Sequence, residues 1–235
     1  MLDNQQQREA LLYERICTTL AVEILDGDWP EKTALTLEEI QHRFGISRTV
    51  AREVAKLLEA VNAVTVRRRV GLVPNPVQQW DALNTQVIQW KLASTHRKQQ
   101  LLDLTELRLA IEPAAAASAA QVAPAQVRAL MPVLAAQLRR TGEAGELDEF
   151  HVLDIQFHTT LLRHSGNELF SAFADVVATV LRGRVELHMY PQRPKPEALD
   201  AHEAVGAAVW EGKPEQARIA MRQIVDEVAH ALDIP

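Results

Sequence analysis

Beyond residue 80 the chain consists almost entirely of segments with helical periodicity, which restricts the fold more than any other feature of the sequence. Apolar residues recur at helical spacing in residues 81–94, 101–121, 124–141, 147–166 and 169–190. They recur in the same way in two final segments, which the sequence GKP at 212–214 separates. Only 5% of the residues are aromatic, while Ala and Leu are abundant, which favours helices over a β-sandwich or barrel. We therefore predict a mostly α protein whose residues 81–235 form an all-α antiparallel helical bundle.

Composition narrows the class of protein. The 235 residues are 47% hydrophobic and 24% charged, as in a globular chain long enough to bury a core. No apolar run reaches the roughly 18 residues that a membrane span needs. The polar N-terminus lacks the apolar core of a signal peptide, so we expect a cytoplasmic protein with no membrane partner. The single cysteine, Cys17, excludes a disulfide framework and a multi-cysteine zinc site.

The first 75 residues have a different pattern. A helix is expected over residues 7–26, and a second, shorter helix begins at Thr36, which has capping-box spacing to Glu39. Gly45 ends the second helix and Ser47 opens a third, after which two short β-like runs flank Gly71. This order predicts a winged helix–turn–helix over residues 1–75. Two prolines mark a boundary, so we place a linker at 76–80, before the helical domain at 81–235.

Positive charge is concentrated between residues 43 and 69, although the whole chain has a formal net charge of −6. Seven Lys and Arg residues against two Glu residues give this segment a net charge of +5. Arg48, Arg52 and Lys56 recur every four residues and so share one face of the third helix. A helix N-terminus that presents amides, hydroxyls and arginines suits the major groove of DNA.

The three arginines at 67–69, beside Gly71, predict a basic wing that follows the DNA backbone or enters the minor groove. The alternative is a solvated charged helix beside a charged turn. The order of capping box, glycine turn, basic helix and basic hairpin favours DNA binding. The predicted DNA-binding residues are Arg43, Ser47, Arg48, Thr49, Arg52, Lys56, Arg67, Arg68, Arg69 and Gly71.

These segments resemble a known family. GISRTVAREVAKLLEA followed by VTVRRRVGLV is similar to the winged helix–turn–helix of the GntR superfamily of bacterial transcription regulators. LTELRLAIEPAAAASAA, DIQFHTTLLRHSGN and HEAVGAAVWEGKPEQARIAM resemble the FCD ligand-binding domain of its FadR branch. The resemblance implies an all-helical effector domain, a homodimer and a two-fold symmetric site on double-stranded operator DNA. It therefore implies a ligand-responsive regulator, and we expect a repressor.

Asp154 and His158 stand four residues apart, so their side chains share one face of a helix, and His151 lies near them. Taken alone, these residues favour a surface Asp–His pair over a metal site. The resemblance implies a divalent metal, zinc or nickel, held by Asp154, His158 and His202. It also implies a fourth ligand at position 224, but this chain has Ile224 there, and an isoleucine side chain cannot bind a metal. Either water or an effector completes a three-ligand site, or the polar groups act without a metal.

Arg108 lies on a helix that is otherwise apolar on one face. It is an exposed charge, the partner of Glu106 or Glu112, or a two-pronged anchor for a carboxylate. The resemblance favours the anchor, because FCD regulators commonly sense small organic acids, and ALNTQVIQW is similar to members that sense sugar acids such as galactonate or gluconate. The predicted effector-binding residues are Arg108, Asp154, His158, Arg182 and His202, with Arg184 as an alternative second anchor.

The rival function from another class is an all-helical metal-dependent enzyme using Asp154, His158 and His202. Such an enzyme needs a general base or nucleophile beside the metal, and only Glu203 and His151 are local candidates. An enzyme also has no use for the basic wing. A third alternative is a helical dimerisation module without a ligand. We predict no catalytic residues and no enzymatic activity.

Overall fold

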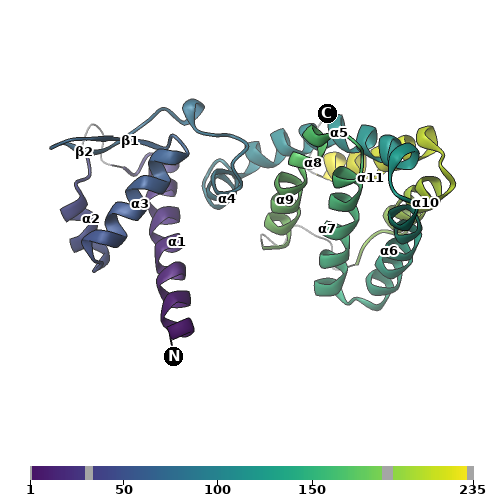
Figure 1. Cartoon of the computed structure of the whole chain (residues 1–235), viewed down its shortest axis with the longest axis horizontal. Helices are drawn as coiled ribbons and strands as arrows, with labels where there is room; N and C mark the ends of the chain where they lie inside the picture. The colour runs from purple at the N-terminus through teal and green to yellow at the C-terminus, as the bar shows by residue number, and fades with distance from the viewer. Residues whose placement is uncertain (1, 30–33, 187–192, 232–235) are drawn as a thin grey trace. The chain divides into compact units, whose positions relative to one another are not determined.

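The computed structural model describes residues 2–29, 34–186 and 193–231, with side chains for the described residues between 12 and 230 (Figure 1). Contacts divide the chain into two compact units, Met1–Lys98 and Gln99–Pro235. No helix among the described residues has the length and apolar composition required to cross a bilayer. The two units have separate hydrophobic cores, and each core is built from its own helices.

The first unit is a winged helix–turn–helix, as the sequence predicts. Its elements are α1 (Leu2–Asp26), α2 (Leu37–Phe44), α3 (Arg48–Ala60), β1 (Val64–Arg67), β2 (Gly71–Pro74), a 3₁₀ turn (Val77–Gln79) and α4 (Thr85–Ala93). Leu20 of α1 and Leu58 of α3 are fully buried in the shared core. The apolar faces of α1 and α3 therefore pack together and leave the polar face of α3 in solvent.

Local signals fix the ends of α2 and α3. The Thr36 hydroxyl accepts from the Glu39 amide at 3.2 Å, and the Glu39 carboxylate accepts from the Thr36 amide at 2.7 Å, which completes the predicted capping box. Gly45 ends α2 with φ at 63°, a left-handed conformation that glycine adopts without strain. Ser47 then caps α3 by accepting from the Val50 amide.

The wing is an antiparallel pair of strands in which Val64 lies opposite Pro74 and Arg67 opposite Gly71. Gly71 has φ at +116°, and a Cβ atom there would lie 2.6 Å from the carbonyl oxygen of Leu35. Leu35 and Leu72 exchange two backbone hydrogen bonds of 2.9 and 3.0 Å. Position 71 thus requires glycine so that the wing can pack against the segment before α2.

Helix α4 packs on α1 and belongs to the first unit. Trp90 of α4 is fully buried and meets Trp80 edge to face, with ring centroids 6.2 Å apart. Asp26 at the end of α1 accepts hydrogen bonds from both the amide and the hydroxyl of Thr95. The packing groups residues 81–98 with the winged unit, whereas the sequence prediction assigned residues 81–98 to the helical domain after a linker at 76–80.

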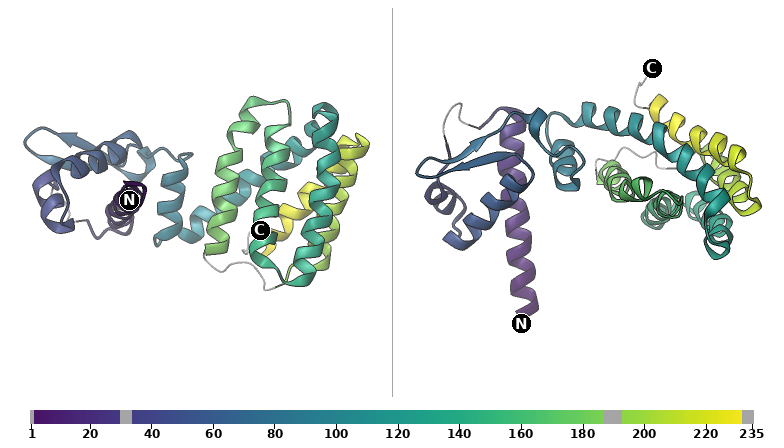
Figure 2. Two further views of the ribbon diagram at one scale, coloured as in Figure 1. Left: turned by 60° about the horizontal axis from the view of Figure 1, so that its bottom comes forward. Right: turned by 45° about the horizontal axis from the view of Figure 1, so that its top comes forward.

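The second unit is an all-helical bundle, in agreement with the prediction. Its helices are α5 (Arg97–Val122, which begins in the first unit), α6 (Ala125–Ala144), α7 (Leu147–Arg163), α8 (Glu168–Ala172), α9 (Ala174–Glu186), α10 (Pro196–Glu211) and α11 (Pro214–Ala231). Neighbouring helices pack in the order α11, α10, α6, α7 and α9 (Figure 2). The helix expected over 169–190 is divided at Phe173 into α8 and α9, and residues 187–190 lie outside the described part.

Small residues allow the helices to approach closely. Ala116, Ala119 and Ala120 of α5 are buried in a core with residues of α6, α7, α10 and α11, and Ala115 is buried in a second core with residues of α7 and α9. A Cβ atom at Gly206 of α10 would lie 3.0 Å from the carbonyl oxygen of Met131 in α6. This close packing brings α7 and α10, which carry the candidate metal ligands, to either side of α6.

Candidate nucleic-acid interface and metal site

Helix α3 presents a polar, positively charged face to solvent. Arg48, Thr49, Arg52 and Lys56 are all exposed. Lys56 forms an exposed ion pair with Glu53 at 2.7 Å, which leaves the two arginines as the main positive groups of this face. The Ser47 hydroxyl accepts from the Val50 amide to cap α3, and its own O–H can still donate to a phosphate.

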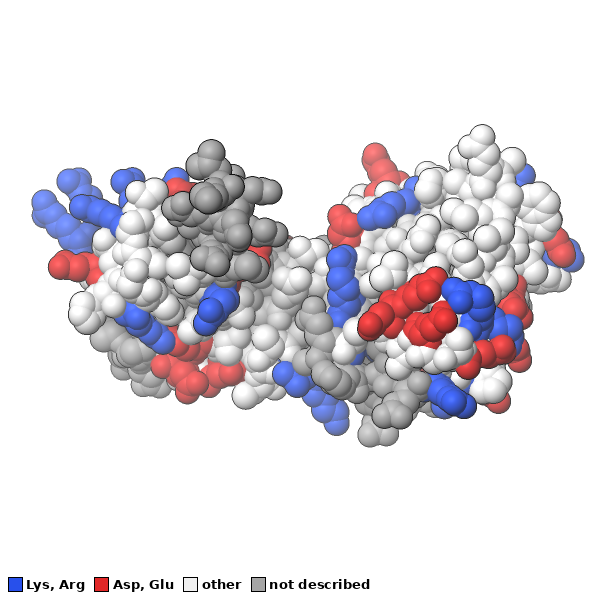
Figure 3. Space-filling model, turned by 90° about the horizontal axis from the view of Figure 1, so that it is seen from below, with Lys and Arg blue, Asp and Glu red and all other residues white. Residues whose placement is uncertain are grey.

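The wing continues this positive surface. Arg67, Arg68 and Arg69 are exposed, and Arg69 has φ at 63° in the turn between the strands. The Glu59 carboxylate at the end of α3 accepts from the Val66 amide of β1 at 3.1 Å, which ties the wing to the basic helix. Figure 3 shows Lys and Arg gathered at its left edge, where the wing lies in Figure 1.

Arg43 is placed differently from the other predicted DNA-binding residues. It lies on α2, where one guanidinium nitrogen donates to the Glu23 carboxylate of α1 at 2.8 Å and a second also pairs with Glu23. Its guanidinium carbon is 5.0 Å from the centroid of the Phe44 ring. The structure therefore shows Arg43 bound to α1, a contact between residues 20 apart that helical periodicity alone does not reveal.

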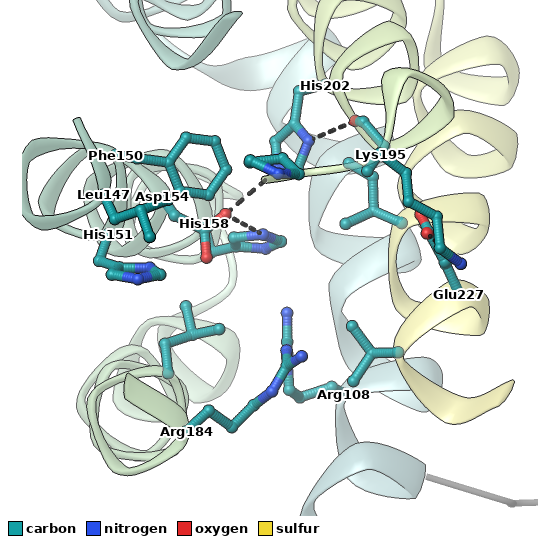
Figure 4. A pocket seen from close by; sticks show the side chains of 15 residues that line it. Arg108, Leu147, Phe150, His151, Asp154, His158, Arg184, Lys195, His202 and Glu227 are labelled. Carbon is teal, nitrogen blue, oxygen red and sulfur yellow. Dashed lines mark hydrogen bonds and ion pairs between the residues drawn. The ribbon is translucent and has the colours of Figure 1, made fainter. Parts of the chain in front are cut away.

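The bundle brings Asp154 and His158 of α7 together with His202 of α10 (Figure 4). The Nε2 atom of His202 is 3.2 Å from Asp154 Oδ1, and the Nε2 atom of His158 is 3.5 Å from the same oxygen. All three side chains are buried, and one ligand atom from each lies within 4.8 Å of the others. The surface Asp–His pair that the sequence also allowed does not occur.

The second nitrogen of each histidine has its own hydrogen-bond partner. His202 Nδ1 donates to the carbonyl oxygen of Ala198 at 2.7 Å, and His158 Nδ1 donates to the Glu112 carboxylate at 2.5 Å. Each Nε2 atom is left to face Asp154. Two imidazole nitrogens and one carboxylate with oriented outer partners are the donor set that zinc or nickel prefers, so these residues fit a divalent metal.

The charges around His158 are strongly coupled. Burial by itself lowers the pKa of His158, but Glu112 and Asp154 outweigh it and raise the pKa to about 9. Burial acts to raise the pKa of Glu112, but Arg108 and His158 bring it down to about 2. The pKa of Asp154 likewise lies well below its usual value, because hydrogen bonds from His158 and His202 outweigh its burial. A metal at this site would replace a proton on His158.

Arg108 both lines the cavity and forms a buried ion pair. Its Nε atom lies 2.5 Å from Glu112 Oε1, and its side chain is 1% exposed. Of the partners that the sequence allowed, the structure therefore shows Glu112, while Glu106 is exposed. The pairing occupies one edge of the guanidinium. The Arg108 side chain lies beside His158 at the cavity, in the lower half of Figure 4.

The cavity beside Asp154 has both polar and apolar walls. Arg184 lines it, whereas Arg182 is exposed, donates to the Ala178 carbonyl and lines a separate groove with Val152. Ile224 is 5% exposed and contributes to the apolar wall. Other lining residues are His151, Lys195, Glu227, Leu147, Phe150, Leu181 and Val228.

Sequence reasoning did not single out Lys195 or Glu227, which form an ion pair of 3.1 Å beside the cavity. It named Glu112 only as a partner of Arg108 and not as a partner of His158. The spacing of four between Arg108 and Glu112 was the available signal. Glu203, a candidate base for the rival enzyme, pairs with Arg139 and does not line this cavity.

A winged helix–turn–helix with a basic recognition helix, carried by the same chain as a helical domain, defines a DNA-binding transcription regulator. Residues 12–73 match the family of bacterial regulatory proteins named gntR, and residues 103–227, more than half of the chain, match the FCD domain. The chain belongs to the GntR family of transcriptional regulators with an FCD domain, and its domains and relatives indicate a transcriptional regulator rather than an enzyme.

Relatives of known sequence agree with this assignment. The galactonate operon transcriptional repressor of Escherichia coli K12 is 27% identical over 83% of this chain and 86% of its own length. The HTH-type transcriptional regulator YieP of the same organism is 29% identical over 68% of this chain and 70% of its own length.

Solved structures show the same fold. A GntR protein of Streptococcus agalactiae has a TM-score of 0.50 at 22% identity, with 93% of this chain and 99% of that chain covered. McbR/YncC of E. coli has a TM-score of 0.52 at 17% identity, with 94% and 96% of the two chains covered.

Proposed function

We propose that this protein is a ligand-responsive repressor that binds operator DNA as a homodimer and senses a small carboxylate in its FCD domain. One combination carries the proposal: an exposed basic helix and wing in one unit, and a buried Asp–His–His cavity lined by arginines in the other. A surface made only for dimerisation would not require that buried polar set. The relative that represses a galactonate operon supports a sugar acid as the ligand.

The DNA interface consists of α3 in the major groove and the wing on the backbone or in the minor groove. Arg48 and Arg52 are the candidates for reading guanine, because an arginine fork matches two acceptors on that base. A homodimer would place two such helices on a symmetric operator, one per half-site. Of the remaining predicted contacts, Thr49 and Lys56 are candidates for phosphates, and the arginines at 67–69 are candidates for the backbone or the minor groove.

The effector site consists of the buried cavity. Asp154, His158 and His202 would hold zinc or nickel, which would supply a Lewis-acid centre for an α-hydroxy carboxylate. The predicted anchors are Arg108 and Arg182, and Arg184 has the better position because it lines the cavity. The apolar side chain of Ile224 on α11 leaves the fourth ligand position to water or to the effector.

A route from the cavity to the DNA-binding unit runs through α5. This helix carries Arg108 and Glu112, and it begins at Arg97, directly after residues that bond to the end of α1. His96 Nε2 lies 2.9 Å from the carbonyl oxygen of Leu25, next to the Thr95 bonds with Asp26. A ligand that shifts α5 would thereby shift the population of DNA-binding conformations.

Replacing Arg52 with alanine is expected to weaken operator binding by about 1–3 kcal/mol if Arg52 reads a guanine. It should also reduce the magnitude of the slope of log affinity against log salt by about 1 if Arg52 contacts phosphate instead. Arg15→Ala is the matched control, because Arg15 is an exposed arginine of the same unit on α1. Fluorescence anisotropy with duplex DNA from the chain's own upstream region measures both quantities. Equal binding by the two variants would exclude α3 as the reading element.

Isothermal calorimetry with galactonate, gluconate and shorter 2-hydroxy acids tests the sensing role. We expect at least one of these acids to bind the zinc-loaded protein and to raise its melting temperature as its concentration rises. Binding should weaken after chelation if the metal holds the carboxylate. Absence of binding by every acid, with and without metal, would contradict the carboxylate assignment.

A further inference from the structure

Glu112 is a buried carboxylate that lies behind the cavity rather than in its lining. Its side chain is 2% exposed, and its two oxygens join two partners. Oε1 lies 2.5 Å from Arg108 Nε, while Oε2 lies 2.5 Å from His158 Nδ1 and 3.5 Å from Arg108 Nη2. We propose that Glu112 is a positioning residue that fixes His158 for metal binding and links it to Arg108. This inference rests on the metal site of the proposed function.

The argument begins with the two nitrogens of His158. A neutral imidazole carries its proton on one nitrogen and a lone pair on the other, and the hydrogen bond at one nitrogen decides which. Because Glu112 accepts from Nδ1–H, the lone pair of the neutral ring lies on Nε2, which faces Asp154 at 3.5 Å. The Glu112 carboxylate therefore selects the tautomer and the ring orientation that a metal at Asp154 requires.

The two candidate histidine ligands are oriented by different kinds of acceptor. The Nδ1 atom of His202 donates to Ala198 O, a backbone carbonyl four residues earlier on the same helix. The Nδ1 atom of His158 instead meets a side chain from another helix, 46 residues away in sequence. His202 is thus positioned by α10 itself, while the position of His158 depends on α5. A change at Glu112 should therefore affect His158 and leave the orientation of His202 intact.

Glu112 also connects the two halves of the cavity. The same carboxylate that orients His158 holds Arg108, which lines the cavity and is a predicted carboxylate anchor. Loss of the carboxylate would remove this contact from both side chains at once. We therefore infer that metal affinity and organic-acid affinity fall together in a Glu112 variant, although Glu112 touches neither ligand.

The alternative is that Glu112 only neutralises buried Arg108. A purely structural ion pair would lower stability when broken, but it would leave the metal affinity of the folded protein unchanged. The contact between His158 Nδ1 and the Oε2 atom of Glu112 distinguishes the two roles, because an ion pair with Arg108 alone would not require it. The test therefore needs a readout at the metal or at the imidazole ring, in addition to stability.

The experiment compares the full-length protein with Glu112→Gln and Glu112→Asp in competition with a chromophoric chelator for Zn²⁺ and Ni²⁺. Glutamine removes the charge, and aspartate keeps the charge but shortens its reach to His158. We expect Zn²⁺ affinity to fall about 10–100-fold in each variant, the usual effect of removing an outer partner of a ligand. Thr105→Val is the control, because Thr105 is buried on the same helix and bonds only to a backbone carbonyl.

A second readout needs no variant. In the Zn²⁺-loaded protein, ¹⁵N-histidine NMR should show that His158 keeps its proton on Nδ1 and ligates through Nε2. Ligation through Nδ1, or variants that bind Zn²⁺ as tightly as the parent, would overturn the role of Glu112. If the parent protein itself binds neither metal, the metal site of the proposed function fails, and this result is distinct from unchanged binding in the variants.

Discussion

Asparagine in place of Asp154 is expected to abolish most zinc and nickel binding, with an affinity loss of at least about 100-fold. Removing an outer partner of a metal ligand costs about 10–100-fold, and Asp154 is itself a predicted ligand, so its loss should cost more. Its Oδ1 atom lies within 3.5 Å of the Nε2 atoms of both His158 and His202. Asparagine keeps the shape of the side chain and removes its charge, which separates ligation from packing.

Asp148→Asn is the matched control for this change. Asp148 lies on the same helix, is exposed and does not line the cavity. Elemental analysis after dialysis against zinc or nickel, together with chelator competition, gives metal content and affinity for both variants. Metal binding that is equal in Asp154→Asn and Asp148→Asn would remove Asp154 from the ligand set.

Methionine in place of Arg108 is expected to destabilise the helical domain by about 3–5 kcal/mol, because a buried carboxylate loses its main counter-charge. Arg108 and Glu112 are 1% and 2% exposed, so water cannot replace the lost partner. The double variant Arg108→Met, Glu112→Leu removes both charges at similar volume and should recover only part of this loss, because the buried Nδ1 atom of His158 then lacks its acceptor. Urea unfolding followed through the transition of the helical domain measures the difference.

Arg163→Met is the control for the loss of an ion pair. Arg163 pairs with Asp175 at 2.9 Å, but both side chains are more than half exposed, so the expected cost is about 0–1 kcal/mol. A single Arg108→Met variant as stable as this control would show that Glu112 does not depend on Arg108. Ligand binding by any Arg108 variant has to be measured on the folded fraction, since lost stability would otherwise be mistaken for lost affinity.

The parts of the fold that follow from neighbouring residues were predictable from sequence. The capping box at Thr36 and Glu39, the turn at Gly45 and the shared face of Asp154 and His158 depend on spacings of a few residues. Such spacings determine local backbone geometry and side-chain direction directly. The helix–turn–helix, the wing and the helical bundle were therefore predictable with their approximate bounds.

Features that depend on distant partners were not predictable in the same way. The pair of Arg43 with Glu23 and the bond of Glu112 to His158 arise only when separate helices pack. Arg182 and Arg184 are two positions apart on a helix, so one faces the cavity and the other does not, and sequence alone does not decide which.

The association of α4 with the winged unit has a similar origin. Trp90 meets Trp80 edge to face, and the bonds of Thr95 to Asp26 join the segment after α4 to the end of α1. Prolines near residue 75 mark a bend in the chain, but a bend does not determine which core the following helix joins. The core that α4 joins is determined by how the buried faces of α1 and α4 pack together.

The most direct test of the regulatory function is the operator affinity of the metal-loaded, full-length protein with and without a carboxylate that calorimetry has shown to bind. Fluorescence anisotropy on duplex DNA at fixed salt gives both affinities. We predict a 5–150-fold change in operator affinity, which corresponds to a coupling free energy of about 1–3 kcal/mol. The change should disappear in Asp154→Asn and persist in Asp148→Asn. An operator affinity that stays constant at saturating ligand would contradict the proposal that the FCD cavity controls DNA binding.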